Sequence, residues 1–325
     1  MLPYSWLVEA AQRIAPYIQK TPLTYDEHED LYLKWENRQV TGSFKARGAF
    51  NRVLSLEPWE RQRGLVAASA GNHGQGLALA GNLVGAPVTI FASEHASKSK
   101  IAAMQSLGAD VHLIPGGYGE VEQAGLDYAA QNQAVWVSGY NDAQVIAGQG
   151  TIALEALSQV PENQPLTWIS PFGGGGLSAG IGCALKEPNQ STQHRLVAAQ
   201  SEASAFGYMA YHQGSQDGVI ELPSLADGLA GPVERGSITL PLAQNYLDDF
   251  VLVTEKEIAE AIAYAWSVYN ERIEGSAAAA LAAALTHKVP ERPALVVISG
   301  GNIDSDLFSS LIQAGKPPSQ DVPHG

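Results

Sequence analysis

The sequence has little cysteine, little positive charge and no long hydrophobic run. Its single cysteine, Cys183, excludes an intrachain disulfide and a metal site built from several cysteines. Lysine and arginine total 19 against 33 aspartates and glutamates, which gives a formal net charge of −14. A nucleic acid or an anionic membrane would need a basic face, so we expect neither as a partner. No apolar stretch approaches the roughly 20 residues that cross a bilayer.

The amino-terminal segment also lacks the basic region and long apolar run of a secretory signal. We therefore predict a cytoplasmic protein. The 325 residues are 45% hydrophobic and only 16% charged, so they can build large buried cores. Their number is about right for two domains.

What the sequence does contain is an alternation of short β-rich segments with longer helical ones. Helix-like runs include 74–85, 98–108 and 255–272. This alternation predicts an α/β fold in which ligands bind at the carboxyl ends of parallel strands. Nine segments, most of them continuously apolar as in a sheet covered on both faces, are predicted strands: 31–36, 64–69, 88–91, 111–114, 135–138, 167–170, 196–199, 250–253 and 295–299.

Four consecutive glycines, 173–176, follow one predicted strand and precede a small-residue helix. They leave backbone N–H groups unobstructed beside the positive end of a helix, which predicts a phosphate ligand. A dinucleotide site is a competing interpretation, because Gly174, Gly176 and Ala179 fit a GxGxxG/A pattern. The next strand ends at Gln200, however, where NAD would need an acidic residue for its ribose. A cofactor with a single phosphate is therefore favoured.

Lys45, in VTGSFKARGAF, is flanked by small residues and by Phe44. Such neighbours form a desolvated pocket, which lowers the pKa of a lysine and makes its amine nucleophilic. Enzymes that use pyridoxal 5'-phosphate (PLP) hold the cofactor's aldehyde as a Schiff base with such a lysine. From spacing alone, a solvated lysine at the start of a helix is the alternative.

Seven motifs together resemble the fold-type-II family of PLP enzymes that contains threonine and serine dehydratases and serine racemase. The resemblance extends from residue 21 to residue 304. It implies two open twisted α/β sheets with flanking helices, as in the tryptophan synthase β subunit. The motifs are TGSFKARGAFN (41–51), SAGNHGQGLALA (69–80), VIAGQGTIALE (145–155), GGGGLSAG (173–180), LADGL (225–229), IEGSAAAALAA (273–283) and SGGNID (299–304).

The resemblance also implies a division into two domains that close over the cofactor. Residues 1–57 and 143–325 are expected to form the larger, PLP-binding domain, and residues 58–142 the smaller inserted one. Members of the family are usually dimers or larger assemblies. We therefore expect a homodimer or a homotetramer.

Individual residues take roles from the resemblance. Lys45, beside Phe44, would carry PLP, and Ser299 would face its pyridine nitrogen. A neutral hydroxyl there does not stabilise a protonated ring nitrogen, so the ring is a moderate electron sink. The phosphate would lie on Gly173, Gly174, Gly175, Gly176 and Leu177. The substrate carboxylate would be held by the loop of Ser69, Ala70, Gly71, Asn72 and His73.

Two of these residues have further readings. Asn72 would also hydrogen-bond the ring hydroxyl of PLP. Glu274 matches a family glutamate near the active site, and an ordinary acidic residue at a helix N-terminus is an equal alternative.

Departures from the relatives narrow the reaction. Ala46 follows the lysine where threonine synthases carry aspartate, and His73 stands where cysteine synthases carry threonine. Ala70 takes the place of a serine that serves serine racemase as an acid–base group. Because alanine cannot transfer a proton, elimination is favoured over racemisation.

Other departures concern metal and substrate. Metal-dependent relatives carry carboxylates where this chain has Gln200 and Phe206, so no metal is expected, with a shifted site at Glu202 left open. We expect the substrate side chain to be lined by Tyr140 and Asn141, and by Phe172, which precedes the glycines. The acidic segment 25–30 is expected to be a solvated loop.

We therefore predict a PLP-dependent ammonia-lyase that removes water from a small β-hydroxy amino acid and yields a 2-oxo acid and ammonia. L-Threonine and L-serine are the first choices. The alternatives are a serine racemase, an ammonia-lyase for 3-hydroxyaspartate or phenylserine, and a non-catalytic relative that keeps the fold as a binding module.

Overall fold

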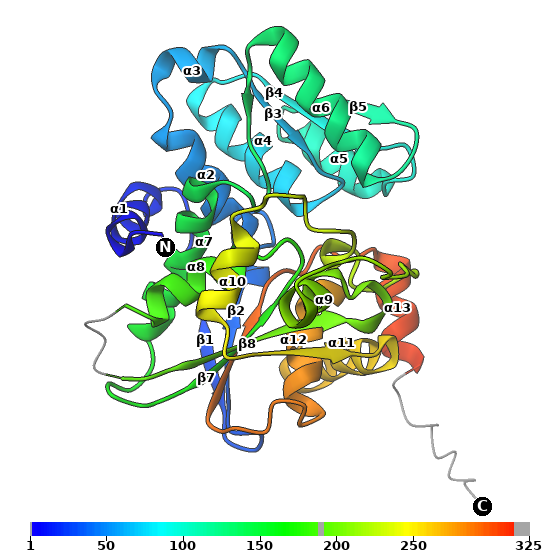
Figure 1. The fold of residues 1–325 in the computed structure, drawn as a ribbon. Helices are drawn as coiled ribbons and strands as arrows, with labels where there is room; N and C mark the ends of the chain where they lie inside the picture. The colour runs from blue at the N-terminus through cyan, green and yellow to red at the C-terminus, as the bar shows by residue number, and fades with distance from the viewer. Residues whose placement is uncertain (1, 188–191, 315–325) are drawn as a thin grey trace, which may run out of the picture.

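The structure is a computed structural model that describes residues 2–187 and 192–314. Within these ranges ten strands form two separate open sheets with helices around them (Figure 1). Among the helices of the described ranges, none is long and apolar enough to cross a membrane.

The larger sheet is parallel except for its first pair, β1 with β2. Side chains alternate between its two faces, as the period of a strand requires. On β10, Leu295 and Val297 pack on one face, and Val296 and Ile298 pack on the other. The strand order is β1 (Leu23–Asp26), β2 (Leu31–Trp35), β10 (Ala294–Ile298), β7 (Thr167–Pro171), β8 (Arg195–Ser201) and β9 (Asp249–Val253).

Helices bury both faces of this sheet, which explains why its strands are continuously apolar. One face is covered by α1 (Tyr4–Ile14), α7 (Ala143–Leu157), α8 (Gly176–Leu185) and α10 (Thr239–Tyr246). The other face is covered by α11 (Glu255–Tyr269), α12 (Gly275–Leu285) and α13 (Ser305–Ala314). The short helix α9 (Phe206–Gln213) follows β8.

The smaller sheet is entirely parallel, in the order β5 (Asp110–Ile114), β4 (Val88–Ser93), β3 (Leu65–Ala68) and β6 (Val135–Trp136). Its core on one face includes residues of α2 (Lys45–Ser55), α4 (Asn72–Val84) and α5 (Lys98–Ser106). The other face packs on α6 (Tyr118–Asn132), and α3 (Pro58–Gln62) precedes β3.

All nine predicted strands are present, with shifted ends. β1 was not predicted, and Tyr25 and Asp26 of the expected acidic loop belong to it. The smaller sheet takes its strands from 65–136, between β2 and β7 of the larger one. The domain boundaries at residues 58 and 142 stay a prediction.

Candidate active site

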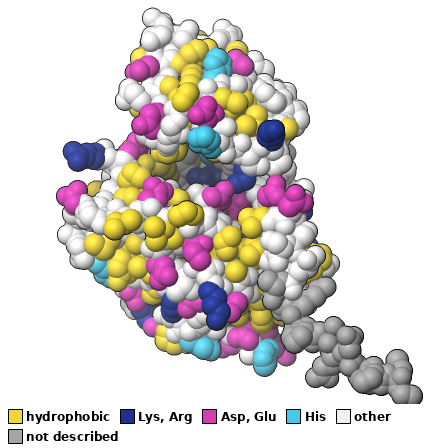
Figure 2. All heavy atoms as spheres, turned by 90° about the vertical axis from the view of Figure 1, so that its right-hand side faces the viewer, with side chains coloured by type: hydrophobic (Ala, Val, Ile, Leu, Met, Phe, Trp, Pro, Cys, Tyr) yellow, Lys and Arg dark blue, Asp and Glu magenta, His cyan; other side chains and the backbone are white. Residues whose placement is uncertain are grey.

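A pocket of about 250 Å³ lies where carboxyl ends of strands from both sheets come together. Its wall combines segments that follow β3, β6, β7 and β10 with the start of α2. Figure 2 shows a hollow near the middle of one face, with basic and acidic side chains beside it. The carboxyl edge of an α/β sheet is where ligands of such folds bind.

Lys45 is the first residue of α2, and its position is fixed by the segment before it. Gly42 has φ +70°, and residues 42–44 run antiparallel to 299–301. The Phe44 N–H donates to the Ser299 carbonyl at 2.9 Å, and the Gly301 N–H donates to the Gly42 carbonyl at 2.9 Å. This pairing brings Lys45 and Ser299, 254 residues apart in the numbering, to one pocket.

The amine of Lys45 is partly buried beside the backbone that follows β6. Its Nζ donates to the Gly139 carbonyl at 2.7 Å and lies 5.1 Å from the centre of the Phe44 ring. Burial lowers the pKa of Lys45 from 10.5 to about 8, and the negative charge of Glu274 opposes this shift in part. About a tenth of the amine is therefore uncharged at pH 7, far more than for an ordinary lysine.

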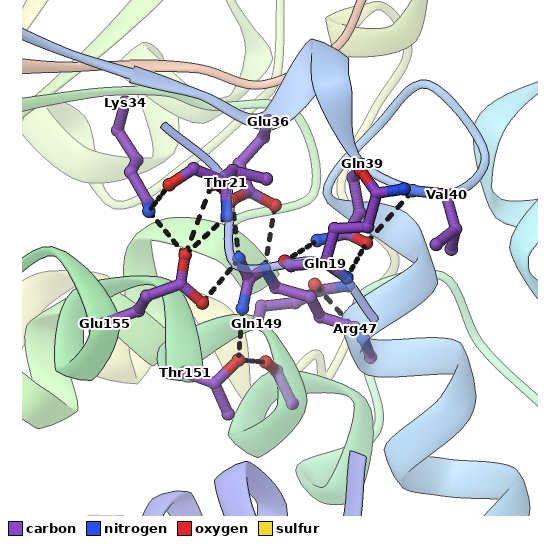
Figure 3. Close-up of polar contacts among 12 residues, drawn as sticks. Gln19, Thr21, Lys34, Glu36, Gln39, Val40, Arg47, Gln149, Thr151 and Glu155 are labelled. Carbon is purple, nitrogen blue, oxygen red and sulfur yellow. Dashed lines mark hydrogen bonds and ion pairs between the residues drawn. The ribbon is translucent and has the colours of Figure 1, made fainter. Parts of the chain in front are cut away.

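An ion network supports α2 just beyond this lysine (Figure 3). The Arg47 guanidinium donates to both carboxylate oxygens of Glu36, at 2.7 and 2.8 Å, and to Glu155 at 3.1 Å. Lys34 donates to Glu155 at 2.5 Å. Burial alone would raise the pKa of Glu36, but the ion pair with Arg47 outweighs it and the pKa is lowered. The network fastens α2 to β2 and α7.

The loop of Ser69 to His73 joins β3 to α4. The Ser69 hydroxyl accepts from the N–H groups of Gly71 and Gly74, at 3.2 and 3.0 Å, and thereby shapes the turn. The first N–H groups of a helix have no intrahelical partner, so the start of α4 suits a carboxylate. All five loop residues line the pocket, Ala70 with only a methyl group.

His73 is buried, and its Nε2–H donates to the Val137 carbonyl at 2.8 Å. Burial, and then the nearby charge of Lys45, lowers the pKa of His73 to about 4. The ring is therefore neutral at physiological pH and tied to the backbone. The sequence predicted His73 in the substrate loop, but it did not predict the hydrogen bond to Val137.

The glycine loop lies between β7 and α8, with Gly175 at φ +83° immediately before the helix. A Cβ at Gly174 would lie 2.2 Å from Cγ of Tyr140, so only glycine fits under that ring. Gly173 to Leu177 all line the pocket, as does Tyr140.

Phe172 is not among the described residues that line the pocket, so the expectation that it contacts the substrate was wrong. It is 1% exposed and packs on Phe250, with ring centres 4.9 Å apart. A Cβ at Gly175 would lie 2.7 Å from the Phe172 ring. Phe172 fills the core beneath the glycine loop.

Glu274 immediately precedes α12, as an acidic residue at a helix N-terminus would, and it also lines the pocket, as the family resemblance implies. It accepts from Nδ2 of Asn72 at 2.7 Å. Burial, followed by the charge of Asp227, raises the pKa of Glu274 from 4.5 to about 7.

Lys100 and Tyr118 line the pocket as well, and sequence reasoning missed both. Lys100 donates to the Asp227 carboxylate at 2.6 Å, so an ion pair joins α5 to the segment 227–229 beside the larger sheet. Asp227 belongs to the LADGL motif, residues 225–229. No local pattern distinguished Lys100 from its neighbour Lys98.

Gln200 and Phe206, which stand where metal-dependent relatives carry carboxylates, serve the fold. Gln200 accepts from the Tyr208 N–H at 3.0 Å, and Phe206 begins α9. Glu202 is exposed. The described residues contain no group of three or more His, Cys, Asp or Glu side chains that could hold a metal ion.

The pocket residues fit PLP. Lys45 supplies a partly buried amine of lowered pKa for the aldehyde. The glycine loop and the start of α8 supply N–H groups without intrahelical partners for a phosphate. Ser299, 2% exposed, supplies a hydroxyl at the same pocket.

Two open α/β sheets that meet around such a lysine and glycine loop define a fold-type-II PLP enzyme. A family model described as "Pyridoxal-phosphate dependent enzyme" matches residues 8–300. The chain therefore belongs to the pyridoxal-phosphate-dependent enzyme family.

Individual relatives agree with this assignment. The L-threonine ammonia-lyase of Thermotoga maritima is 38% identical over 322 residues, 97% of this chain and 79% of the relative. The catabolic L-threonine dehydratase TdcB of Escherichia coli K12 is 35% identical over 94% of each chain. The structure of maize serine racemase superposes with a TM-score of 0.85 at 31% identity, over 96% of this chain and 97% of the other.

Proposed function

We propose that the protein is a PLP-dependent ammonia-lyase that converts a β-hydroxy amino acid, L-threonine or L-serine, into a 2-oxo acid and ammonia. The observation that carries this proposal is the partly buried Lys45 amine, with a pKa of about 8, in a pocket where Ala70 offers only a methyl group. The names of the relatives from Thermotoga maritima and Escherichia coli support the reaction class.

The residues divide the work of binding. Gly173 to Leu177 would hold the cofactor phosphate. Ser299 would face the pyridine nitrogen, and Asn72 would donate to the ring hydroxyl. When bound, PLP supplies an aldehyde for the substrate's amino group and a ring that withdraws electrons from Cα. The loop from Ser69 to His73 binds the substrate carboxylate through the N–H groups at the start of α4.

Lys45 moves the proton. Its Nζ, uncharged when the substrate is in place, accepts the proton from Cα as a general base. The lowered pKa suits this step, because a base works best when its pKa is near the working pH. The β-hydroxyl leaves with a proton as water. The remaining enamine tautomerises to an imine, which takes up one water and releases the 2-oxo acid and ammonia. Tyr140, which follows β6 and packs against Gly174, would border the substrate side chain.

A substrate panel tests the proposal. The holoenzyme is incubated with L-threonine, L-serine, 3-hydroxyaspartate and phenylserine, and ammonia, 2-oxo acid and D-amino acid are measured. We expect 2-oxo acid and ammonia in equal amounts from L-threonine or L-serine. D-Serine formed faster than 2-oxo acid would instead identify a racemase, and preference for either of the other two substrates would revise the specificity.

A second experiment tests the lysine. Lys45→Ala should abolish turnover and the visible absorption of lysine-bound cofactor. Lys98→Ala, at an exposed position of α5 that is not part of the pocket lining, should keep both. Full turnover by Lys45→Ala would contradict the mechanism. A wild-type protein that gains no visible absorption on addition of PLP would favour a non-catalytic relative.

We further propose the division into domains at residues 58 and 142, and a homodimer or homotetramer. Light scattering on the purified holoenzyme tests the assembly. A monomer at micromolar concentration would contradict it.

A further inference from the structure

Asn302 lies behind the pocket, in the segment that follows β10. Among the described residues it is not part of the pocket lining. Its Nδ2 donates to the Thr41 carbonyl at 2.8 Å and to Oδ1 of Asn72 at 2.7 Å. Asn72 in turn donates through Nδ2 to Glu274 at 2.7 Å. A continuous chain of hydrogen bonds therefore leads from a backbone carbonyl to the buried carboxyl.

The direction of this chain is set at its backbone end. A carbonyl oxygen only accepts, so the Asn302 atom that faces Thr41 must be the amide nitrogen. That nitrogen carries a second hydrogen, which points to Asn72, so the facing atom of Asn72 must be its oxygen. The NH₂ group of Asn72 is then left to face Glu274.

The two ends of an asparagine amide have nearly the same size, so packing alone selects poorly between its two orientations. Hydrogen-bond partners make the selection. Glu274 alone is an incomplete selector, because its pKa of about 7 leaves it partly protonated near neutral pH and able to donate. The Thr41 carbonyl has no such ambiguity.

We propose that Asn302 is a positioning residue that fixes the amide orientation of Asn72, so that Asn72 presents its N–H groups to the pocket. The inference rests on the proposed role of Asn72 in holding PLP. It also accounts for Gly42. A Cβ there would lie 2.5 Å from Oδ1 of Asn302, and the positive φ of Gly42 turns the chain directly after the Thr41 carbonyl.

Asn302→Asp reverses the relay without changing the size of the side chain. A carboxylate only accepts, so it repels the Thr41 carbonyl and draws the NH₂ group of Asn72 toward itself. Asn72 then turns its oxygen to Glu274 and to the pocket. One hydrogen bond to the cofactor is lost, which weakens PLP binding about 10- to 100-fold.

The test measures the PLP dissociation constant of the full-length protein by titrating its visible absorption. Asn302→Asp should weaken binding as stated, and Asn302→Ala should weaken it less, because Asn72 is then free to adopt either orientation. Asn245→Asp is the matched control, since its Nδ2 also donates to a backbone carbonyl, at 2.9 Å, but on the surface of α10. It should leave the constant unchanged.

A double substitution separates positioning from general support of the fold. In an Asn72→Ala background, Asn302→Ala should weaken PLP binding no further, within a factor of two. An equal loss in both backgrounds would overturn the proposal, as would an Asn302→Asp protein that binds PLP like the control. Asn302→Ala supports both comparisons even where the aspartate variant does not fold. PLP binding is measured without substrate, so this result stands apart from which amino acid the enzyme converts.

Discussion

Replacing Glu274 with glutamine should change how the stability of the cofactor-free protein depends on pH. The carboxyl group is 5% exposed, and its pKa is raised from 4.5 to about 7. At about 1.4 kcal/mol per pKa unit, this shift corresponds to a cost of about 3 kcal/mol for the charged carboxylate in the folded protein. Glutamine keeps the shape and can accept from Asn72, but it carries no charge.

The sign follows from proton binding. Between pH 4.5 and about 7 the folded protein holds more protons at Glu274 than the unfolded chain does. The free energy of unfolding therefore falls as the pH rises through this window. The glutamine variant has no such loss, so its stability relative to wild type should grow by about 2–3 kcal/mol from pH 5 to pH 8. The attraction between Glu274 and Lys45 is already contained in this raised pKa.

Urea denaturation of both cofactor-free proteins at pH 5, 6, 7 and 8, at constant ionic strength, measures the difference. Glu162→Gln, at an exposed position, serves as the control and should show no pH-dependent gain. A gap between Glu274→Gln and wild type that stays constant across the range would refute the reasoning. A wild type that is the more stable protein at pH 8 would do the same, because the charged carboxylate would then stabilise the fold.

Three further predictions concern the glycine loop, the ion network and the mouth of the pocket. Gly174→Ala would place Cβ 2.2 Å from the Tyr140 ring, so the loop must shift and PLP binding should weaken by at least about 10-fold. Gly119→Ala is the control and should leave PLP binding unchanged, because its Cβ would meet no other described side chain within 4 Å. Titration of the visible absorption measures both dissociation constants. Arg47→Met leaves the buried Glu36 carboxylate unpaired, so urea denaturation should show a loss of about 3–5 kcal/mol, and Arg47→Met with Glu36→Gln should lose less. Lys100→Met breaks an ion pair whose aspartate is 58% exposed, so the unfolding free energy should change by less than about 1 kcal/mol. Lys100 lowers the pKa of Glu274, so the same variant should raise that pKa. The fall of the unfolding free energy with rising pH should then extend to higher pH than in the wild type.

The sequence predicted the central strands well because each is apolar on both faces. β10, for example, is buried along its whole length between two layers of helices. β1 was missed because it is an edge strand with only partly buried ends and an exposed centre. Its polar residues match a loop as well as a strand, and only pairing with β2 selects the strand.

The candidate site divides in the same way. Lys45, the glycine loop and Ser299 belong to motifs, and the structure brings them to one pocket. Lys100 and Tyr118 reach it because the two sheets face each other, which no local pattern records. Phe172 failed for a related reason, since a residue next to a binding loop can point into the core beneath it.

The small residues before Lys45 are explained by these tertiary contacts rather than by the helix that follows. Gly42 makes room for Asn302, and Ser43 sits in a bridge to Gly300 that leaves no space for a larger side chain, since it is fully buried. Two residues after the lysine, Arg47 is locked to Glu36. The lysine is therefore held on both sides by groups that cannot shift independently. Such support keeps a desolvated amine in place, because an unsupported lysine would turn toward water and regain its ordinary pKa.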